Sequence, residues 1–233
     1  MCRSLCVVLC LALLGPTALL AEPLRVQLPQ YRTLSSSETE SLEPALLERV
    51  AEGLGRPASF VASAQDADVR VAEGDPAQAA IYYRAAPAAL SATGGGLGAW
   101  SDLQGQPVCV SRDSPHGSML RTRFAAHPHE YASTAHALIG LKLGECRAVV
   151  DDDVLLTEIA TLPEWQRYRH LLPVLDDAKR HLSLATDDPD LLQQINTLLT
   201  QWEAGGQLAE LTRQWVDEVA FQAYVLADTL DCH

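Results

Sequence analysis

Three consecutive aspartates, Asp151 to Asp153, end the segment "RAVVDDD", in which Val149 and Val150 predict a short buried strand. Ligands of open parallel sheets bind outside the carboxyl ends of the strands, so a carboxylate at that position can hold a cationic group. The simpler alternative is that the three side chains cap a helix beginning near Val154. A metal site is disfavoured, because three successive aspartates point in different directions.

A second polar segment, "DSPHGS", contains Ser114 and His116 at the expected start of a helix. Ser114 is a candidate N-cap, and the free N–H groups of a helix N-terminus can also bind an anion. The four nearby histidines match no metal-ligand spacing, and we interpret them as surface residues. They are His116, His127, His129 and His136. We therefore predict no metal and no cofactor.

Catalytic patterns are not evident in the sequence. No Ser-His-Asp set is apparent, and "DSPHG" lacks the arrangement of a nucleophile elbow. The glycines of "LSATGGGLGAW" precede neither a Lys-Ser nor a Lys-Thr pair, so they predict a surface turn rather than a phosphate loop. We expect a protein that is not an enzyme.

Length and charge restrict the possible partners. The chain has 233 residues and a formal net charge of −13, with 48% hydrophobic residues. This composition can form a core for one large or two small domains. The negative charge argues against nucleic acid and against docking on an anionic membrane, because both require clustered Lys and Arg.

The N-terminal segment, residues 1–21, has the layout of a secretory signal peptide. Arg3 precedes an apolar run, which a "GP" pair interrupts. A retained membrane anchor is the alternative, although the run is short for a spanning helix. Cleavage would place the protein in the periplasm, not embedded in the membrane. Only Cys109, Cys146 and Cys232 would remain, which allows one disulfide and one leftover thiol.

The remaining sequence alternates strand and helix patterns, which predicts an α/β fold. Strands are expected at residues 23–30, 58–63, 67–73, 106–112, 131–134, 147–153, 169–174 and 180–186. Helices are expected at residues 41–55, 114–128, 135–145, 154–163, 188–206 and 207–220. The strand-helix-strand-helix-strand order in the middle predicts a second α/β unit with parallel strands.

Three stretches occur in an order that is typical of one protein family. They are "DLQGQPVCVSRDSPHGS", "ALIGLKLGECRAVVDDDVLL" and "DPDLLQQINTLLTQWEAGGQLAELTRQWV". They resemble, in this order, segments of periplasmic solute-binding proteins of family 3, the polar amino-acid type that serves ABC importers. The resemblance implies a type II periplasmic-binding-protein fold, in which two α/β lobes are joined by two crossing strands. Lobe one would comprise residues 22–88 and 185–233, and lobe two residues 93–180.

The same resemblance implies roles for individual residues. Asp152 matches the aspartate that takes the ligand's ammonium group, while Asp151 and Asp153 would cap or be solvated. Ser114 to Gly117 match the turn that holds the ligand carboxylate, although Pro115 and His116 depart from the family pattern. Cys109 and Cys146 match a pair that is bridged in some relatives.

Lobe one departs from the family in two places. The loop after the first strand, "QYRTLSSSETES", keeps Tyr31 as its candidate aromatic ligand contact. The segment whose arginine clamps the ligand carboxylate is missing between "VAEGDP" and the crossing strand. Arg84 and Arg32 are the candidate substitutes.

The resemblance implies a monomer that binds a small polar solute, an amino acid or a related compound, and delivers it to the permease subunits of an ABC importer. Hinge closure of the lobes would enclose the solute. The shortened lobe leaves an alternative open: a degenerate relative that acts as a periplasmic accessory or sensory partner, for example of a quinoprotein dehydrogenase, without amino-acid transport.

Overall fold

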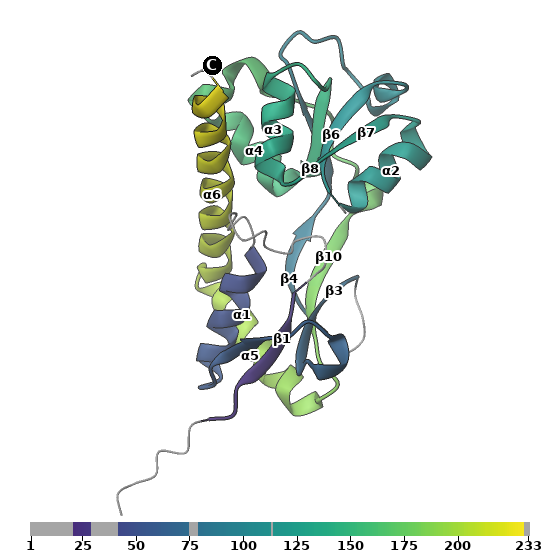
Figure 1. Ribbon diagram of the computed structural model, residues 1–233. Helices are drawn as coiled ribbons and strands as arrows, with labels where there is room; N and C mark the ends of the chain where they lie inside the picture. The colour runs from purple at the N-terminus through teal and green to yellow at the C-terminus, as the bar shows by residue number, and fades with distance from the viewer. Residues whose placement is uncertain (1–20, 29–41, 75–78, 113, 231–233) are drawn as a thin grey trace, which may run out of the picture.

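The computed structural model describes residues 21–28, 42–74, 79–112 and 114–230, and arranges them as two α/β lobes (Figure 1). The first lobe is built on a five-stranded sheet in the order β2-β1-β3-β10-β4. Its strands are β1 (Leu24–Gln27), β2 (Ala58–Phe60), β3 (Val69–Glu73), β4 (Ala79–Ala85) and β10 (Arg180–Ala185). β1 pairs in parallel with β2 and β3, whereas β10 runs antiparallel between β3 and β4.

The second lobe has its own five-stranded sheet, in the order β7-β6-β8-β5-β9. Its strands are β5 (Pro87–Ser91), β6 (Pro107–Ser111), β7 (His127–Tyr131), β8 (Ala148–Asp152) and β9 (His170–Leu171). β6 is parallel to both β7 and β8, as the order of elements predicted, and β5 pairs antiparallel with β8. The parallel arrangement brings the carboxyl ends of β6 and β8 to one edge of the sheet.

The helices follow the apolar periodicity and the capping residues of the sequence. α1 (Leu42–Gly53) buries Leu46, Leu47 and Val50 on one face. α5 (Pro189–Ala204) begins where the Asp188 carboxylate accepts hydrogen bonds from two backbone N–H groups of the first turn. The second lobe contains α2 (Pro115–Phe124), α3 (Thr134–Lys142) and α4 (Asp153–Thr161).

Two segments cross between the lobes. β4 of the first sheet is separated from β5 of the second by Ala86 alone. β10 returns from the second lobe into the middle of the first sheet. The backbone of this crossing is fixed by Asp153, whose carboxylate accepts a hydrogen bond of 2.9 Å from the Ala86 N–H.

One strand in the second lobe differs from the sequence-based expectation. A short strand was expected at residues 131–134, but β7 ends at Tyr131. Ser133 instead caps α3, because its hydroxyl accepts a hydrogen bond from the backbone N–H of His136. The strand therefore lies earlier in the chain, in the polar segment "HPHEY".

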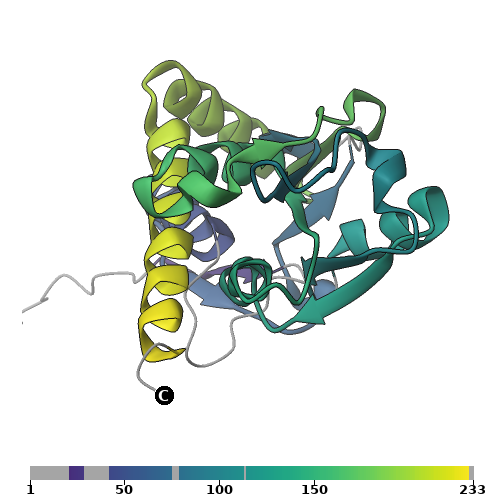
Figure 2. The same ribbon diagram turned by 90° about the horizontal axis from the view of Figure 1, so that it is seen from above.

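α6 (Gln207–Leu230) is a long helix that lies alongside both lobes (Figures 1 and 2). It contacts α1 and α5 of the first lobe and α3 and α4 of the second. Its residues share one cluster of buried apolar side chains with both sheets. The segment "FQAYVLADTL", which follows the helix expected at residues 207–220, is the last part of α6. In the described part of the chain, no helix combines the length and apolar character needed to cross a membrane.

A disulfide joins Cys109 of β6 to Cys146, the pair that the resemblance implied. α3 packs closely on this bridge at Gly140, where an added Cβ would lie 2.9 Å from the Cys109 Sγ. The hydroxyl of Tyr131 lies on the same side and donates a short hydrogen bond to Glu145. Burial and, secondarily, this carboxylate raise the pKa of Tyr131. The disulfide, the tyrosine and the glycine thus form one packed unit.

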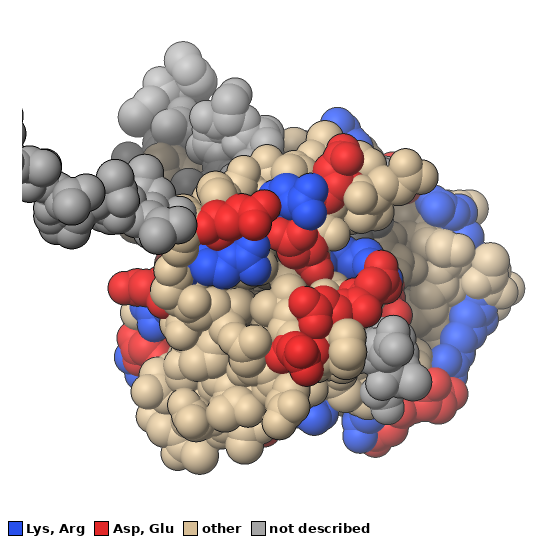
Figure 3. Space-filling model, turned by 90° about the horizontal axis from the view of Figure 1, so that it is seen from below, with Lys and Arg blue, Asp and Glu red and all other residues tan. Residues whose placement is uncertain are grey.

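Acidic and basic side chains are interspersed on the surface. On the face seen in Figure 3, several acidic side chains gather near the centre, with Lys and Arg between and around them. The described part of this face therefore carries no continuous basic surface of the kind that binds phosphate backbones.

Candidate functional site

Asp152 stands where the second lobe meets the crossing strands. It is the last residue of β8, opposite Pro87 at the start of β5, and it is the position from which α4 begins. Its side chain is 0% exposed. The sequence predicted this place at the carboxyl end of the strand, and the structure adds that the carboxylate is buried.

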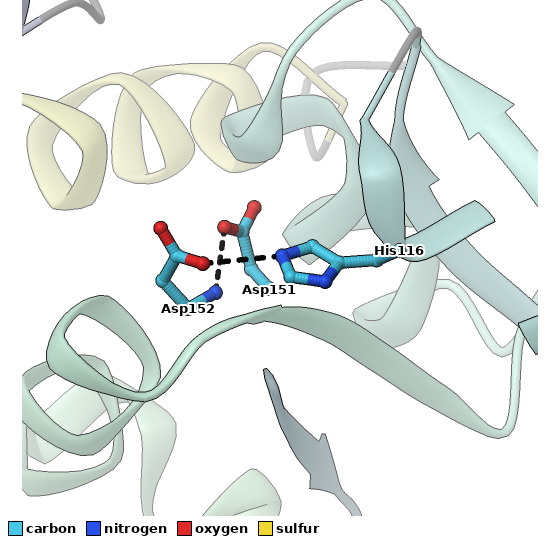
Figure 4. A group of neighbouring side chains, drawn as sticks. All are labelled: His116, Asp151 and Asp152. Carbon is cyan, nitrogen blue, oxygen red and sulfur yellow. Dashed lines mark hydrogen bonds and ion pairs between the residues drawn. The ribbon is translucent and has the colours of Figure 1, made fainter. Parts of the chain in front are cut away.

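Two nitrogen atoms approach the same oxygen of Asp152. The His116 Nε2 lies 3.2 Å from the Asp152 Oδ1 (Figure 4). The Arg180 Nη1 lies 3.8 Å from that oxygen. A buried carboxylate needs such compensation, because burying a charge without partners is costly. Asp152 therefore has partners that the chain itself provides.

His116 is correspondingly not a surface residue, and that prediction was wrong for this histidine. Its side chain is 3% exposed, because α2 turns it inward toward the end of β8. His127 and His129 on β7 are exposed, in agreement with the prediction, and His136 is half-buried. His127, His129 and His136 do not join the buried cluster that His116 forms with Asp151 and Asp152.

The two aspartates beside Asp152 serve other contacts. One oxygen of Asp151 accepts a hydrogen bond of 2.8 Å from the Thr134 hydroxyl, and the other accepts one of 2.8 Å from the Asp152 N–H. The Asp153 carboxylate accepts hydrogen bonds of 2.9 Å from the backbone N–H groups of Ala86 and Val154. Asp152, which has the N-cap backbone position, makes no side-chain capping bond. The three carboxylates thus contact different elements. Asp151 holds the start of α3, Asp153 holds the crossing segment, and Asp152 contacts His116.

Ser114 has the capping role that the sequence predicted. Its hydroxyl accepts a hydrogen bond of 3.3 Å from the His116 backbone N–H at the start of α2. The same turn directs the His116 ring toward Asp152. Ser114, His116 and Asp152 therefore lie together at the edge where β6 and β8 end, and their role as ligand contacts stays a prediction.

Arg84, the described candidate of the first lobe, is not part of this group. Arg84 lies on β4 with its side chain 58% exposed, and its Nη1 is 4.0 Å from the Glu203 Oε1 of α5. It also lines a small pocket between β4 and the start of α6. Tyr31 and Arg32 lie outside the described residues.

Arg180 is a site residue that the sequence reasoning missed. It is the first residue of β10, where its guanidinium also lies 3.6 Å from the Glu73 carboxylate of β3. The side chain is 7% exposed. The available signal was a charged residue at the entry to an apolar crossing strand, "RHLSLA". Burial of an arginine predicts a paired carboxylate.

His116, Asp151 and Asp152 also have the donor types of a metal site. One donor atom from each lies within 4.8 Å of the others, and all three residues are buried. The Asp151 oxygens already accept hydrogen bonds, and the Arg180 cation approaches Asp152. A cation beside the donors opposes a second positive charge there. We therefore assign no metal to this group.

Comparisons with known proteins give structural matches only. No protein-family model matches the sequence, and no curated protein matches it. An ancestral cationic amino-acid solute-binding protein, AncCDT-1, aligns with a TM-score of 0.63 and 19% identity over 83% of this chain and 95% of its own. That protein is also described as a precursor of cyclohexadienyl dehydratase.

Two further solved structures have the same arrangement. The arginine-, lysine-, histidine-binding protein ArtJ of Geobacillus stearothermophilus has a TM-score of 0.60 and 14% identity, over 83% of this chain and 94% of its own. The ligand-binding core of GluR0 with L-glutamate has a TM-score of 0.59 and 16% identity, over 83% and 98%. At these identities the likeness concerns the fold. The protein has the two-lobed periplasmic-binding-protein fold that the sequence predicted.

Proposed function

We propose that the protein is a non-enzymatic periplasmic receptor, which binds a small polar solute between its lobes and delivers it to the permease of an ABC importer. The N-terminal 21 residues would direct export, and the exported chain would act as a monomer without a cofactor. The fold supports this proposal, since proteins with the same architecture include amino-acid binders.

The observation that carries the proposal is the convergence at the ends of β6 and β8. Ser114 and His116 follow β6, and Asp152 ends β8, so the polar side chains of two parallel strands meet at one edge. This edge faces the crossing segments that join the lobes. Ligands of open α/β sheets bind at such an edge.

A second candidate function is favoured by different observations. Asp152 is buried on partners within the chain, and α6 contacts both lobes. Opening the hinge would separate apolar surfaces that α6 now covers. A protein that remains closed suits a periplasmic accessory or sensory partner, which is recognised by another protein rather than by a solute.

Thermal unfolding with a panel of amino acids, amines and small organic acids separates the two. A solute at about 100 times its dissociation constant adds about 2.7 kcal/mol, which raises the unfolding midpoint by several degrees. A shift confined to one chemical class supports the receptor. A flat panel with a cooperative unfolding transition contradicts it and favours the protein partner, which cross-linking in periplasmic extracts would then identify.

A further inference from the structure

We propose that Arg180 is a specificity-determining residue. Its guanidinium occupies the position beside the Asp152 carboxylate that a solute's ammonium group would otherwise take. The inference rests on the proposed function, because it concerns the same site. It goes further by naming the class of solute that the site rejects: free α-amino acids and amines.

The geometry supplies a cation and its carboxylate from different lobes. Arg180 begins β10 of the first sheet, and Asp152 ends β8 of the second. The Arg180 Nη1 is 3.8 Å from the Asp152 Oδ1, and the Glu73 carboxylate holds the guanidinium from its other side at 3.6 Å. His116 contacts the same Asp152 oxygen at 3.2 Å. The Asp152 charge is therefore neutralised inside the protein.

Displacing this guanidinium is unfavourable for an incoming ammonium group. The ammonium would replace one charge-assisted contact with another, so the carboxylate gains little. Arg180, which is almost fully buried, would lose its nearest second-lobe anion or would have to move into solvent. A solute without an ammonium group requires no such displacement. The site therefore favours neutral or carboxylate solutes over their amino counterparts.

The first experiment compares solutes that differ only in the amino group, measured on the wild-type protein by thermal unfolding. L-glutamate against glutarate and L-alanine against propionate are suitable pairs. We expect the amino member of each pair to shift the midpoint less than its counterpart. A larger shift with the amino members overturns the inference.

The second experiment removes the internal cation and supplies one from solution. Arg180→Ala leaves Asp152 facing an emptied position, and methylguanidinium should bind there and raise the midpoint by about 5 °C at saturation. Wild type and Arg180→Ala/Asp152→Asn should not respond. Arg123→Ala is the matched control, because it breaks an exposed pair with Asp177, where water solvates the remaining carboxylate. Sodium chloride at equal ionic strength controls for screening.

The outcomes separate this inference from the proposed function. A flat panel on the wild type with methylguanidinium rescue of Arg180→Ala contradicts solute binding but supports the role of Arg180 on Asp152. A folded Arg180→Ala that ignores methylguanidinium overturns the inference, whichever solutes the wild type binds. Should Arg180→Ala fold poorly, its refolding yield decides: restoration by methylguanidinium supports the inference, and an unchanged yield overturns it.

Discussion

Tyr83 and Trp215 meet edge to face, with ring centroids 6.2 Å apart and an interplanar angle of 83°. Tyr83 lies on β4, the strand that leads into the second lobe, and Trp215 lies on α6. Both side chains are buried. The pair attaches the long C-terminal helix to the crossing strand, so α6 is fixed at the hinge as well as against the helices of both lobes.

Replacing Trp215 with alanine should therefore destabilise the whole protein. The substitution removes a buried indole and its aromatic contact, which costs about 3–5 kcal/mol in the free energy of unfolding. Urea unfolding followed by circular dichroism measures the loss. Tyr224→Ala is the matched control, because this α6 side chain is 57% exposed, and it should change stability by less than about 0.5 kcal/mol. Equal effects of the two substitutions would show that α6 is not anchored at Trp215.

The disulfide between Cys109 and Cys146 closes a loop with a sequence separation of 37 residues. Loop-closure entropy predicts that the bridge stabilises the folded protein by about 3–4 kcal/mol. The Cys109→Ala/Cys146→Ala variant should lose that amount in urea unfolding. Peptide mapping without reductant should recover the linked pair from the wild type. Recovery of Cys232 linked to either residue would contradict the assignment.

The sequence predicted the elements whose local pattern agrees with their final surroundings. In α1, Leu46, Leu47 and Val50 have helical spacing because they lie on the buried face. The start of α5 is indicated by the N-cap Asp188 and by Pro189 in the first turn. β7 was misplaced because "HPHEY" has no alternating apolar residues, and Pro128 is tolerated in a strand at the edge of the sheet. Such a strand is defined by its neighbour β6 rather than by its own composition.

The site was predictable in position but not in its contacts. Asp152 follows an apolar strand, and that local pattern placed it at the ligand edge. Its pairing with Arg180 depends on how β10 returns between β3 and β4, which no local periodicity encodes. The end of α6 was equally hidden, because Phe221 and Tyr224 face outward while Ala223 is buried.

Gly140 and Gly117 are helical glycines for which alanine should have opposite effects. A Cβ at Gly140 would lie 2.6 Å from the Tyr131 Cζ and 2.9 Å from the Cys109 Sγ, so Gly140→Ala should destabilise by about 1–3 kcal/mol. At Gly117 the nearest atoms are 3.8 Å away, and alanine should stabilise by about 0.4–1 kcal/mol. Urea midpoints of the two variants test this. A neutral Gly140→Ala would mean that α3 moves off the disulfide freely.

Asp68 links the first strands of lobe one and should make part of the stability depend on pH. Its carboxylate accepts hydrogen bonds from the Arg25 backbone and side chain, and Arg56 lies 3.4 Å away. The hydrogen bond from the Arg25 guanidinium, more than any other contact, holds the pKa of Asp68 below its usual value. The folded protein thus favours the charged carboxylate more than the unfolded chain does.

This direction fixes the pH range of the effect. The pair stabilises the fold above the ordinary aspartate pKa of about 3.9, and the contribution is lost as the pH falls through the lower pKa of the folded state. Because Arg25 is half exposed to solvent, which screens the pair, we expect only a weak coupling at pH 7. A double-mutant cycle of Arg25→Ala and Asp68→Asn, measured by urea unfolding from pH 7 to pH 3, should show the coupling shrinking below pH 4. A coupling that stays constant over this range would mean that the Asp68 charge does not contribute to it.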